Sequence, residues 1–154
     1  MKELLAPDVV NSFLDVVVRY LRSTVGIDAV VAAIGEPEPL EQTIAVALDF
    51  RGDVRGPVTW VFPQPIALEL VRRLMCQPDP SPEFANDGAT ELANILTGRA
   101  SEVLERHGFQ CEFGVPRLHI GELPTGITVR MATADGPIDI VLSMAKTGRF
   151  KRVD

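Results

Sequence analysis

Residues 87–108 read DGATELANILTGRASEVLERHG. Wound at about 100° per residue, this stretch gathers its apolar residues on one side, which predicts an amphipathic α-helix. Asn86 or Asp87 is expected to cap its N-terminus, because short polar side chains accept hydrogen bonds from the free N–H groups there. The apolar side holds Leu92, Ile95, Leu96, Ala100, Val103, Leu104 and His107, and the opposite side holds Asp87, Glu91, Asn94, Gly98, Ser101 and Glu105.

The polar side of this helix carries an acid and an amide as neighbours. Glu91 and Asn94 lie three residues apart, so both are expected to project from the solvent face together. Gly98 follows one turn later on the same face, although glycine inside a helix costs about 1 kcal/mol relative to alanine. Because no core-packing role is expected on an exposed face, Gly98 suggests that something outside the helix approaches closely. We therefore interpret this face as a docking surface.

The spacing of the pair is not distinctive by itself. Glu83 and Asn86 form a second Glu-x-x-Asn just upstream, in a proline-rich loop. What separates Glu91 and Asn94 from that pair is their place at the centre of a long polar helix face, beside Gly98. A helix face that only meets water remains the competing interpretation, since exposed polar residues on helices are the norm.

Composition limits the class of protein. The 154 residues suffice for one domain, and we expect residues 1–154 to form it. A net charge of −6 argues against nucleic acid or an anionic membrane as the main partner. No apolar run approaches the roughly 18 residues of a membrane span, and the N-terminal segment lacks a signal-peptide core. A cytoplasmic location is the resulting expectation.

Metal and redox chemistry find little support in the sequence. Cys76 and Cys111 are far apart and show no ligand spacing, so a half-buried free thiol is expected at each. His107 and His119 have no matching ligand partners, and no intrinsic metal site is predicted.

The remaining pattern predicts an α+β fold. An amphipathic helix is expected over residues 8–24 and a second one from Pro65 to Met75, opened by its proline. Asp135-Gly136 predicts a hairpin turn, and hairpin-linked strands imply a largely antiparallel sheet. The tail from Lys146 is expected to fray. Strands are expected at residues 28–34, 43–50, 57–62, 109–113, 118–121, 127–134 and 138–144.

Familiar catalytic motifs are absent from the sequence. It contains no phosphate-binding GxxxxGK[ST] loop, no GxGxxG turn, no HExxH helix and no GxSxG elbow. Glu91 and Asp87 are i, i+4 neighbours, but a fully exposed pair of acids lacks the setting that acid–base catalysis usually needs.

The segment resembles the active-site helix of the CheC/CheX/FliY phosphatases of bacterial chemotaxis. In that family an Asp or Ser is followed by Glu four residues on, Asn three further and a proline about twenty residues later. Asp87, Glu91, Asn94 and Pro116 fill those places, and the order of elements along the whole chain agrees. Ala93 stands where glycine is common before the Asn. This chain has a single credible Glu-x-x-Asn helix, whereas CheC-type members carry two, so it resembles the CheX branch more closely.

The resemblance implies a CheC-like fold in the order α-β-β-β-α-α-β-β-β, a homodimer made through the sheet or its edges, and a phosphorylated CheY-like receiver as substrate. It assigns catalysis to Asn94, which would orient a water in line with the phosphorus, and to Glu91, which would pair with the receiver's lysine. Gly98 would allow close approach, and Asp87 would support docking as a helix cap. The chain would need no cofactor of its own, because Mg²⁺ sits on the receiver.

Two other functions stay open at this point. The chain could be a CheX-like binding module that docks on a receiver or flagellar-switch protein without hydrolysis. It could also be a small acidic domain whose helix face is only solvated.

Overall fold

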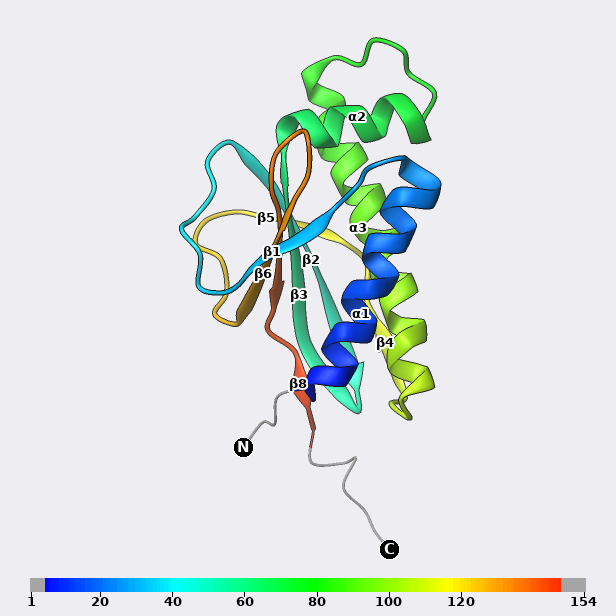
Figure 1. Cartoon of the computed structure of the whole chain (residues 1–154), viewed down its shortest axis with the longest axis vertical. Coiled ribbons are helices and arrows are strands. Elements are labelled where there is room, and N and C mark those ends of the chain that lie inside the picture. The colour runs from blue at the N-terminus through cyan, green and yellow to red at the C-terminus, as the bar shows by residue number, and fades with distance from the viewer. Residues whose placement is uncertain (1–4, 148–154) are drawn as a thin grey trace, which may run out of the picture.

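An antiparallel β-sheet forms one layer of the molecule, and two long helices lie side by side against it (Figure 1). The computed structural model describes residues 5–147. Its helices are α1 (Pro7–Tyr20), α2 (Gln64–Leu74) and α3 (Ala85–Arg106), with short helical turns at Leu21–Val25 and Pro82–Phe84. Its strands are β1 (Val30–Gly35), β2 (Thr43–Gly52), β3 (Val54–Pro63), β4 (Cys111–Phe113), β5 (Arg117–His119), β6 (Ile127–Ala132), β7 (Ile138–Leu142) and β8 (Ala145–Lys146).

The sheet has the order β1-β6-β7-β3-β2-β4, and every neighbouring pair is antiparallel. β5 pairs with β2 beside β4, and β8 pairs with β3. Asp135-Gly136 connects β6 to β7, where Gly136 has a φ of 124° that suits glycine. The predicted α+β class with a largely antiparallel sheet is confirmed.

One short strand was not expected from the residue pattern. Five strands follow α3, whereas the residue pattern predicted four and the order implied by the resemblance had three. The additional strand is β8, which reaches the start of the segment that was expected to fray: Ala145 and Lys146 pair with Arg55 and Val54. The rest of that tail, residues 148–154, lies outside the described residues.

The core lies between the helices and one face of the sheet. Trp60 of β3 is completely buried there, and Phe13 of α1 stacks on it with ring centroids 6.1 Å apart. α1 reaches the core through residues spaced at helical intervals, among them Val9, Phe13 and Val17. The helix is extended by the turn at Leu21–Val25, so the expected helix over residues 8–24 is close to the observed extent.

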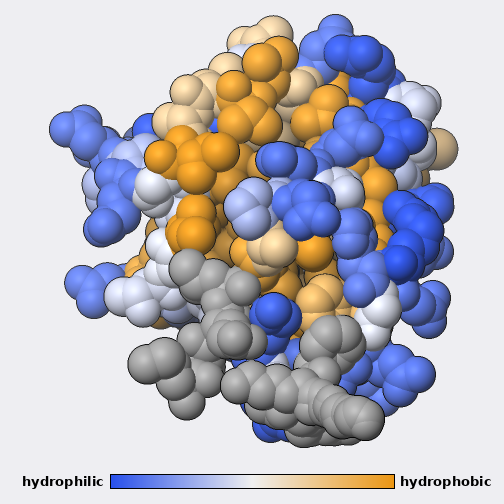
Figure 2. All heavy atoms as spheres, turned by 60° about the horizontal axis from the view of Figure 1, so that its bottom comes forward, coloured by the Kyte–Doolittle hydropathy of each residue, from blue (hydrophilic) through white to orange (hydrophobic). Residues whose placement is uncertain are grey.

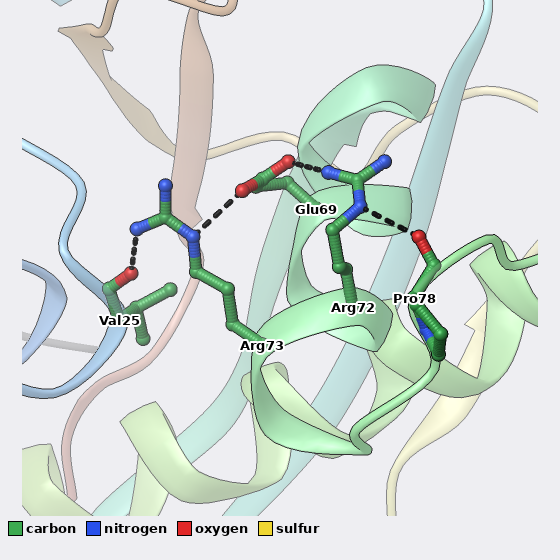
Figure 3. A network of polar contacts seen from close by, with 5 residues as sticks. All are labelled: Val25, Glu69, Arg72, Arg73 and Pro78. Atoms are coloured by element: carbon green, nitrogen blue, oxygen red, sulfur yellow. Dashed lines mark hydrogen bonds and ion pairs between the residues drawn. The ribbon is translucent and has the colours of Figure 1, made fainter.

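A polar network on α2 links three segments (Figure 3). Glu69 forms ion pairs with both Arg72 and Arg73. Arg73 also donates to the carbonyl of Val25 at the end of the helical turn that follows α1, and Arg72 donates to the carbonyl of Pro78 in the loop after α2. α2 is thereby tied to the segments before and after it, and it lies across one end of α3 in Figure 1.

No helix in residues 5–147 is long and apolar enough to span a membrane.

Candidate functional site

α3 is the element that presents the predicted site. It packs against α1, α2 and β2, so the helix is held on several sides. The buried residues of α3 include most of those predicted for its apolar side, namely Leu92, Leu96, Ala100, Val103 and Leu104. Two expectations for the apolar side fail: His107 is exposed at the end of the helix, and Ile95 is only half-buried. On the opposite side, Asp87, Glu91, Asn94 and Glu105 are exposed as predicted, whereas Gly98 and Ser101 are half-buried.

A buried hydrogen bond fixes how α3 is rotated about its axis. The indole Nε1 of Trp60 donates to the hydroxyl of Thr97 over 2.9 Å, and that hydroxyl donates to the carbonyl of Ala93 over 2.7 Å. All three residues are completely buried. Thr97 lies about 60° around the helix from Asn94 at 100° per residue, so this bond fixes the direction in which Asn94 projects, on the part of the exposed side that borders the core. The sequence analysis did not identify Thr97, because a threonine at this position carries no distinctive pattern.

Asp87, Glu91 and Asn94 are all exposed, as predicted. Within residues 5–147 their side chains form no hydrogen bond or ion pair, so the carboxylate of Glu91 and the carboxamide of Asn94 are available to a partner. Residues three apart on a helix have Cβ atoms about 5–6 Å apart, so the two groups can engage one target together. Figure 1 shows that α3 has the sheet and α1 along its inner side.

Asp87 is not the N-cap of the helix. The helix begins at Ala85, preceded by the short turn at Pro82–Phe84, and the N-cap residue Phe84 makes no side-chain cap bond. The proline-led turn supplies the first hydrogen bonds, so neither Asn86 nor Asp87 is needed as a cap. Asp87 instead lies in the first turn, where its negative charge suits the helix dipole.

The two glycines of α3 have different surroundings. A Cβ at Gly98 would lie 3.7 Å from the ring of Phe113, an ordinary contact, and the residue is half-buried. Gly98 is therefore partly covered by β4 rather than fully open. A Cβ at Gly88 would lie 2.7 Å from the carbonyl oxygen of Ala67, so this glycine is the one that lets α2 approach α3 closely.

The second Glu-x-x-Asn pair has a different place in the structure. Glu83 and Asn86 are exposed too, but Glu83 lies in the short helical turn and Asn86 in the first turn of α3. The two therefore sit at a junction between two kinds of helix, whereas Glu91 and Asn94 share one continuous helix face.

A groove with several arginines runs between α1 and α3. It has a volume of about 350 Å³, and Arg99 lies over the ring of Tyr20 with its guanidinium carbon 5.4 Å from the centroid. Arg106 lines the same groove and makes no ion pair among residues 5–147. The flank of α3 that faces α1 therefore carries positive charge beside the acidic face.

A second hollow, of about 600 Å³, lies at the far end of α3, next to Arg51, Arg55 and Cys111. Burial raises the pKa of the Cys111 thiol to about 11, with Asp53 and Glu105 adding to the shift. Cys76 is exposed, contrary to the expectation of a half-buried thiol, whereas Cys111 is half-buried as expected.

Pro116 lies in the connection from β4 to β5, at the sheet edge beside α3. α3 contacts β2, β4 and β5, so the predicted proline and the Glu91–Asn94 face belong to one side of the molecule.

Comparisons with known proteins show the family of the chain. Residues 44–136 match the family model described as Chemotaxis phosphatase CheX, which is more than half of the chain. No curated protein sequence matches the chain.

The fold is similar to solved structures of this family. Chemotaxis protein CheX from Desulfovibrio desulfuricans superposes with a TM-score of 0.74 at 14% identity, covering 91% of this chain and 99% of that one. CheX from Vibrio vulnificus gives 0.74 at 19% identity, covering 90% and 98%. CheX from Borrelia burgdorferi, solved as a complex with CheY, BeF3 and Mg²⁺, gives 0.67 at 18% identity, covering 92% and 100%.

At these identities the structures establish the fold, and the family model establishes membership. The matched residues include Trp60, Asp87, Glu91, Asn94 and Pro116, so the whole candidate site lies inside the match. The chain belongs to the CheX family of chemotaxis phosphatases.

Proposed function

We propose that this chain dephosphorylates the aspartyl phosphate of a CheY-like receiver, with Asn94 positioning the attacking water and Glu91 anchoring the receiver. The observation that carries the proposal is the pairing of an exposed carboxamide with an exposed carboxylate on one rigid helix face, both without partners among residues 5–147.

The chemistry requires little from the phosphatase. The receiver brings the phosphoryl group together with its Mg²⁺ and a basic residue, so the phosphatase has only to place a water in line with the phosphorus. A neutral carboxamide suits this task, because Asn94 can donate to and accept from a water without adding negative charge. Glu91 suits the anchoring task by pairing with the receiver's lysine.

The partner class is supported by a structural neighbour. CheX from Borrelia burgdorferi was solved in a complex with CheY, BeF3 and Mg²⁺. We extend that class of partner to this chain. Asp87 and Gly98 flank the pair at one turn before Glu91 and one turn after Asn94, so we assign them to the same contact, Asp87 through its charge and Gly98 through its small size.

We also propose a homodimer formed through the β1 edge of the sheet. β1 is the outermost strand next to β6, and its side chains Val30 and Ile34 are 64% and 62% exposed. Figure 2 shows hydrophobic residues gathered on the side of the molecule that holds the sheet, whereas the side that holds α1 and α3 is mostly hydrophilic. A six-residue edge with apolar side chains is a natural site for strand pairing between copies. Sedimentation of the protein and of Ile34→Asn tests this, since a monomeric wild type would contradict it.

The phosphatase activity is tested by the lifetime of the acyl phosphate on a panel of purified CheY-like receivers. The wild type is expected to shorten the lifetime on at least one receiver. Asn94→Ala and Glu91→Ala are expected to lose this effect. The matched controls are Asn86→Ala and Glu83→Ala, the same changes in the other Glu-x-x-Asn, which are expected to retain it.

The pattern of results separates the alternatives. Loss of activity in all four variants would indicate general damage to α3 rather than a specific role of the pair. A wild type that binds the receivers but leaves the phosphate lifetime unchanged would show a binding module and contradict the proposal.

A further inference from the structure

The edge strand β5 and the residue that follows it leave large apolar side chains in solvent beside the candidate site. Leu118 is 45% exposed and Ile120 is 91% exposed, although neighbouring polar residues of the same segment have partners. Arg117 forms an ion pair with Asp49, and His119 bonds to the carbonyl of Glu122. A contiguous group of exposed apolar side chains, rather than a single one, marks a contact with another molecule, and Leu118 and Ile120 lie only two residues apart.

Strand register shows which side of the sheet these side chains face. Leu118 pairs with Val46, and Val46 pairs with Trp60. Residues directly opposite each other on neighbouring strands share a face, and Trp60 reaches α3 through its bond to Thr97. Leu118 therefore faces the α3 side.

The alternation along an extended chain, carried one residue past each end of β5, assigns Pro116 and Ile120 to the same side. We call these three residues, Pro116, Leu118 and Ile120, the β5 shelf.

Along the axis of α3, the β5 shelf lies at the same height as Glu91 and Asn94. Trp60 contacts Thr97, which is one turn from Asn94, and Leu118 lies in the same row across the sheet as Trp60. The row spans two strand spacings, about 10 Å. α3 lies mainly over β2, and a helix is about 10–12 Å wide, so β5 extends just beyond its edge. This explains why Leu118 is only partly covered.

We infer that the β5 shelf is the apolar half of the receiver-docking surface, and that the receiver carries matching apolar side chains at the rim of its phosphorylation site. The inference rests on the proposed function. A partner of ordinary size covers about 800 Å² on each protein, a footprint that reaches farther from Asn94 than the shelf lies. A receiver that places its phosphoryl group at Asn94 therefore has the shelf within reach of its footprint.

A second copy of the chain fits this surface less well. β5 has three residues and is preceded by Pro116, which has no N–H to offer to another strand. β1 at the other end of the sheet has six residues and its own exposed aliphatic side chains. The two edges thus suit two different partners, the receiver at β5 and a second copy at β1.

Two matched substitutions test this division. Ile120→Asn and Ile34→Asn make the same chemical change on opposite edges of the sheet, and both side chains are exposed, so neither change removes core packing. Binding is measured with CheY-like receivers activated by BeF3 and Mg²⁺, and self-association by sedimentation. Ile120→Asn and Leu118→Asn are expected to weaken receiver binding by about five- to tenfold, the effect of truncating an interface anchor. Ile34→Asn is expected to leave receiver binding unchanged.

Kinetics distinguish docking from chemistry. Ile120→Asn is expected to raise KM for the phosphorylated receiver and to leave kcat unchanged, since the shelf touches no reacting atom. Unchanged receiver affinity in Ile120→Asn and Leu118→Asn would overturn the inference while leaving the phosphatase proposal intact. Loss of self-association instead of receiver binding would overturn it as well. A panel in which no receiver binds the wild type would overturn both proposals together.

Discussion

The indole of Trp60 donates a hydrogen bond to the buried hydroxyl of Thr97, and this contact joins the sheet to the helix that carries Glu91 and Asn94. The bond crosses the core between β3 and α3, and the same hydroxyl donates back to Ala93 within the helix. The direction in which Glu91 and Asn94 project therefore depends on a polar contact inside the core. Hydrophobic packing alone would tolerate small rotations of the helix.

Thr97→Val is expected to lower the free energy of unfolding by about 1–3 kcal/mol, because it leaves the Trp60 N–H buried without an acceptor. Urea denaturation measures the change. The control is the same substitution in a Trp60→Phe background, where no donor is left unpaired and Thr97→Val is expected to cost much less. Equal costs in both backgrounds would show that the bond contributes nothing specific.

Gly88→Ala is expected to destabilise the fold by about 1–3 kcal/mol, because the new methyl group would overlap the carbonyl oxygen of Ala67 and force α2 away from α3. Thermal unfolding measures the effect. A variant as stable as the wild type would mean that α2 can shift without cost.

Gly98→Ala is expected to leave stability unchanged or to raise it by up to about 1 kcal/mol, since the methyl group would make only an ordinary contact with Phe113 and alanine favours helix. The same variant is expected to bind the activated receiver more weakly, because the methyl group adds bulk to the docking face. Retained affinity would remove Gly98 from the contact.

Asp139→Ala is expected to cost about 3–5 kcal/mol of unfolding free energy, since it leaves the guanidinium of Arg130, which is only 20% exposed, without its carboxylate partner. The carboxylate of Asp139 accepts from Arg130 Nε at 2.8 Å, and this hydrogen bond raises the pKa of the Arg130 guanidinium. The comparison is Asp15→Ala, which breaks the exposed pair with Arg19 and is expected to cost less than about 1 kcal/mol. Similar costs for the two variants would contradict this difference in burial.

The two thiols are expected to react at different rates with a disulfide reagent at pH 8. The thiolate is the reactive form, and a pKa of about 11 keeps Cys111 protonated at that pH, whereas Cys76 is exposed. Reaction of Cys111 is expected to accelerate as the pH rises toward 11, because deprotonation then becomes favourable. Cys76→Ala isolates the slow thiol, and fast labelling of that variant at pH 8 would contradict the assignment.

Much of the fold follows from periodicity in the sequence. The apolar stripe of residues 87–108 and the turn at Asp135-Gly136 identified α3 and the β6–β7 hairpin, because both patterns act locally. The start of α3 was wrong by about two residues, since the turn at Pro82–Phe84 replaced a side-chain cap. β8 was missed because a two-residue strand is stabilised only by its partner β3, which the sequence does not reveal.

The candidate site shows the same limit. Glu91 and Asn94 were identified from their shared helix face and the family pattern, and the structure places both in solvent as expected. Thr97, Gly88 and Leu118 could not be found in that way, because each acts through a residue far along the chain, namely Trp60, Ala67 and Val46.

The most direct measurement is single-turnover loss of phosphate from a receiver already saturated with Asn94→Ala protein. Binding to the BeF3-activated receiver is expected to stay close to that of the wild type, because Glu91 and the docking surface are unchanged. The rate of phosphate loss is expected to fall by about a hundredfold, since the water is no longer held in line. An Asn94→Ala protein that releases phosphate at the wild-type rate would contradict the account.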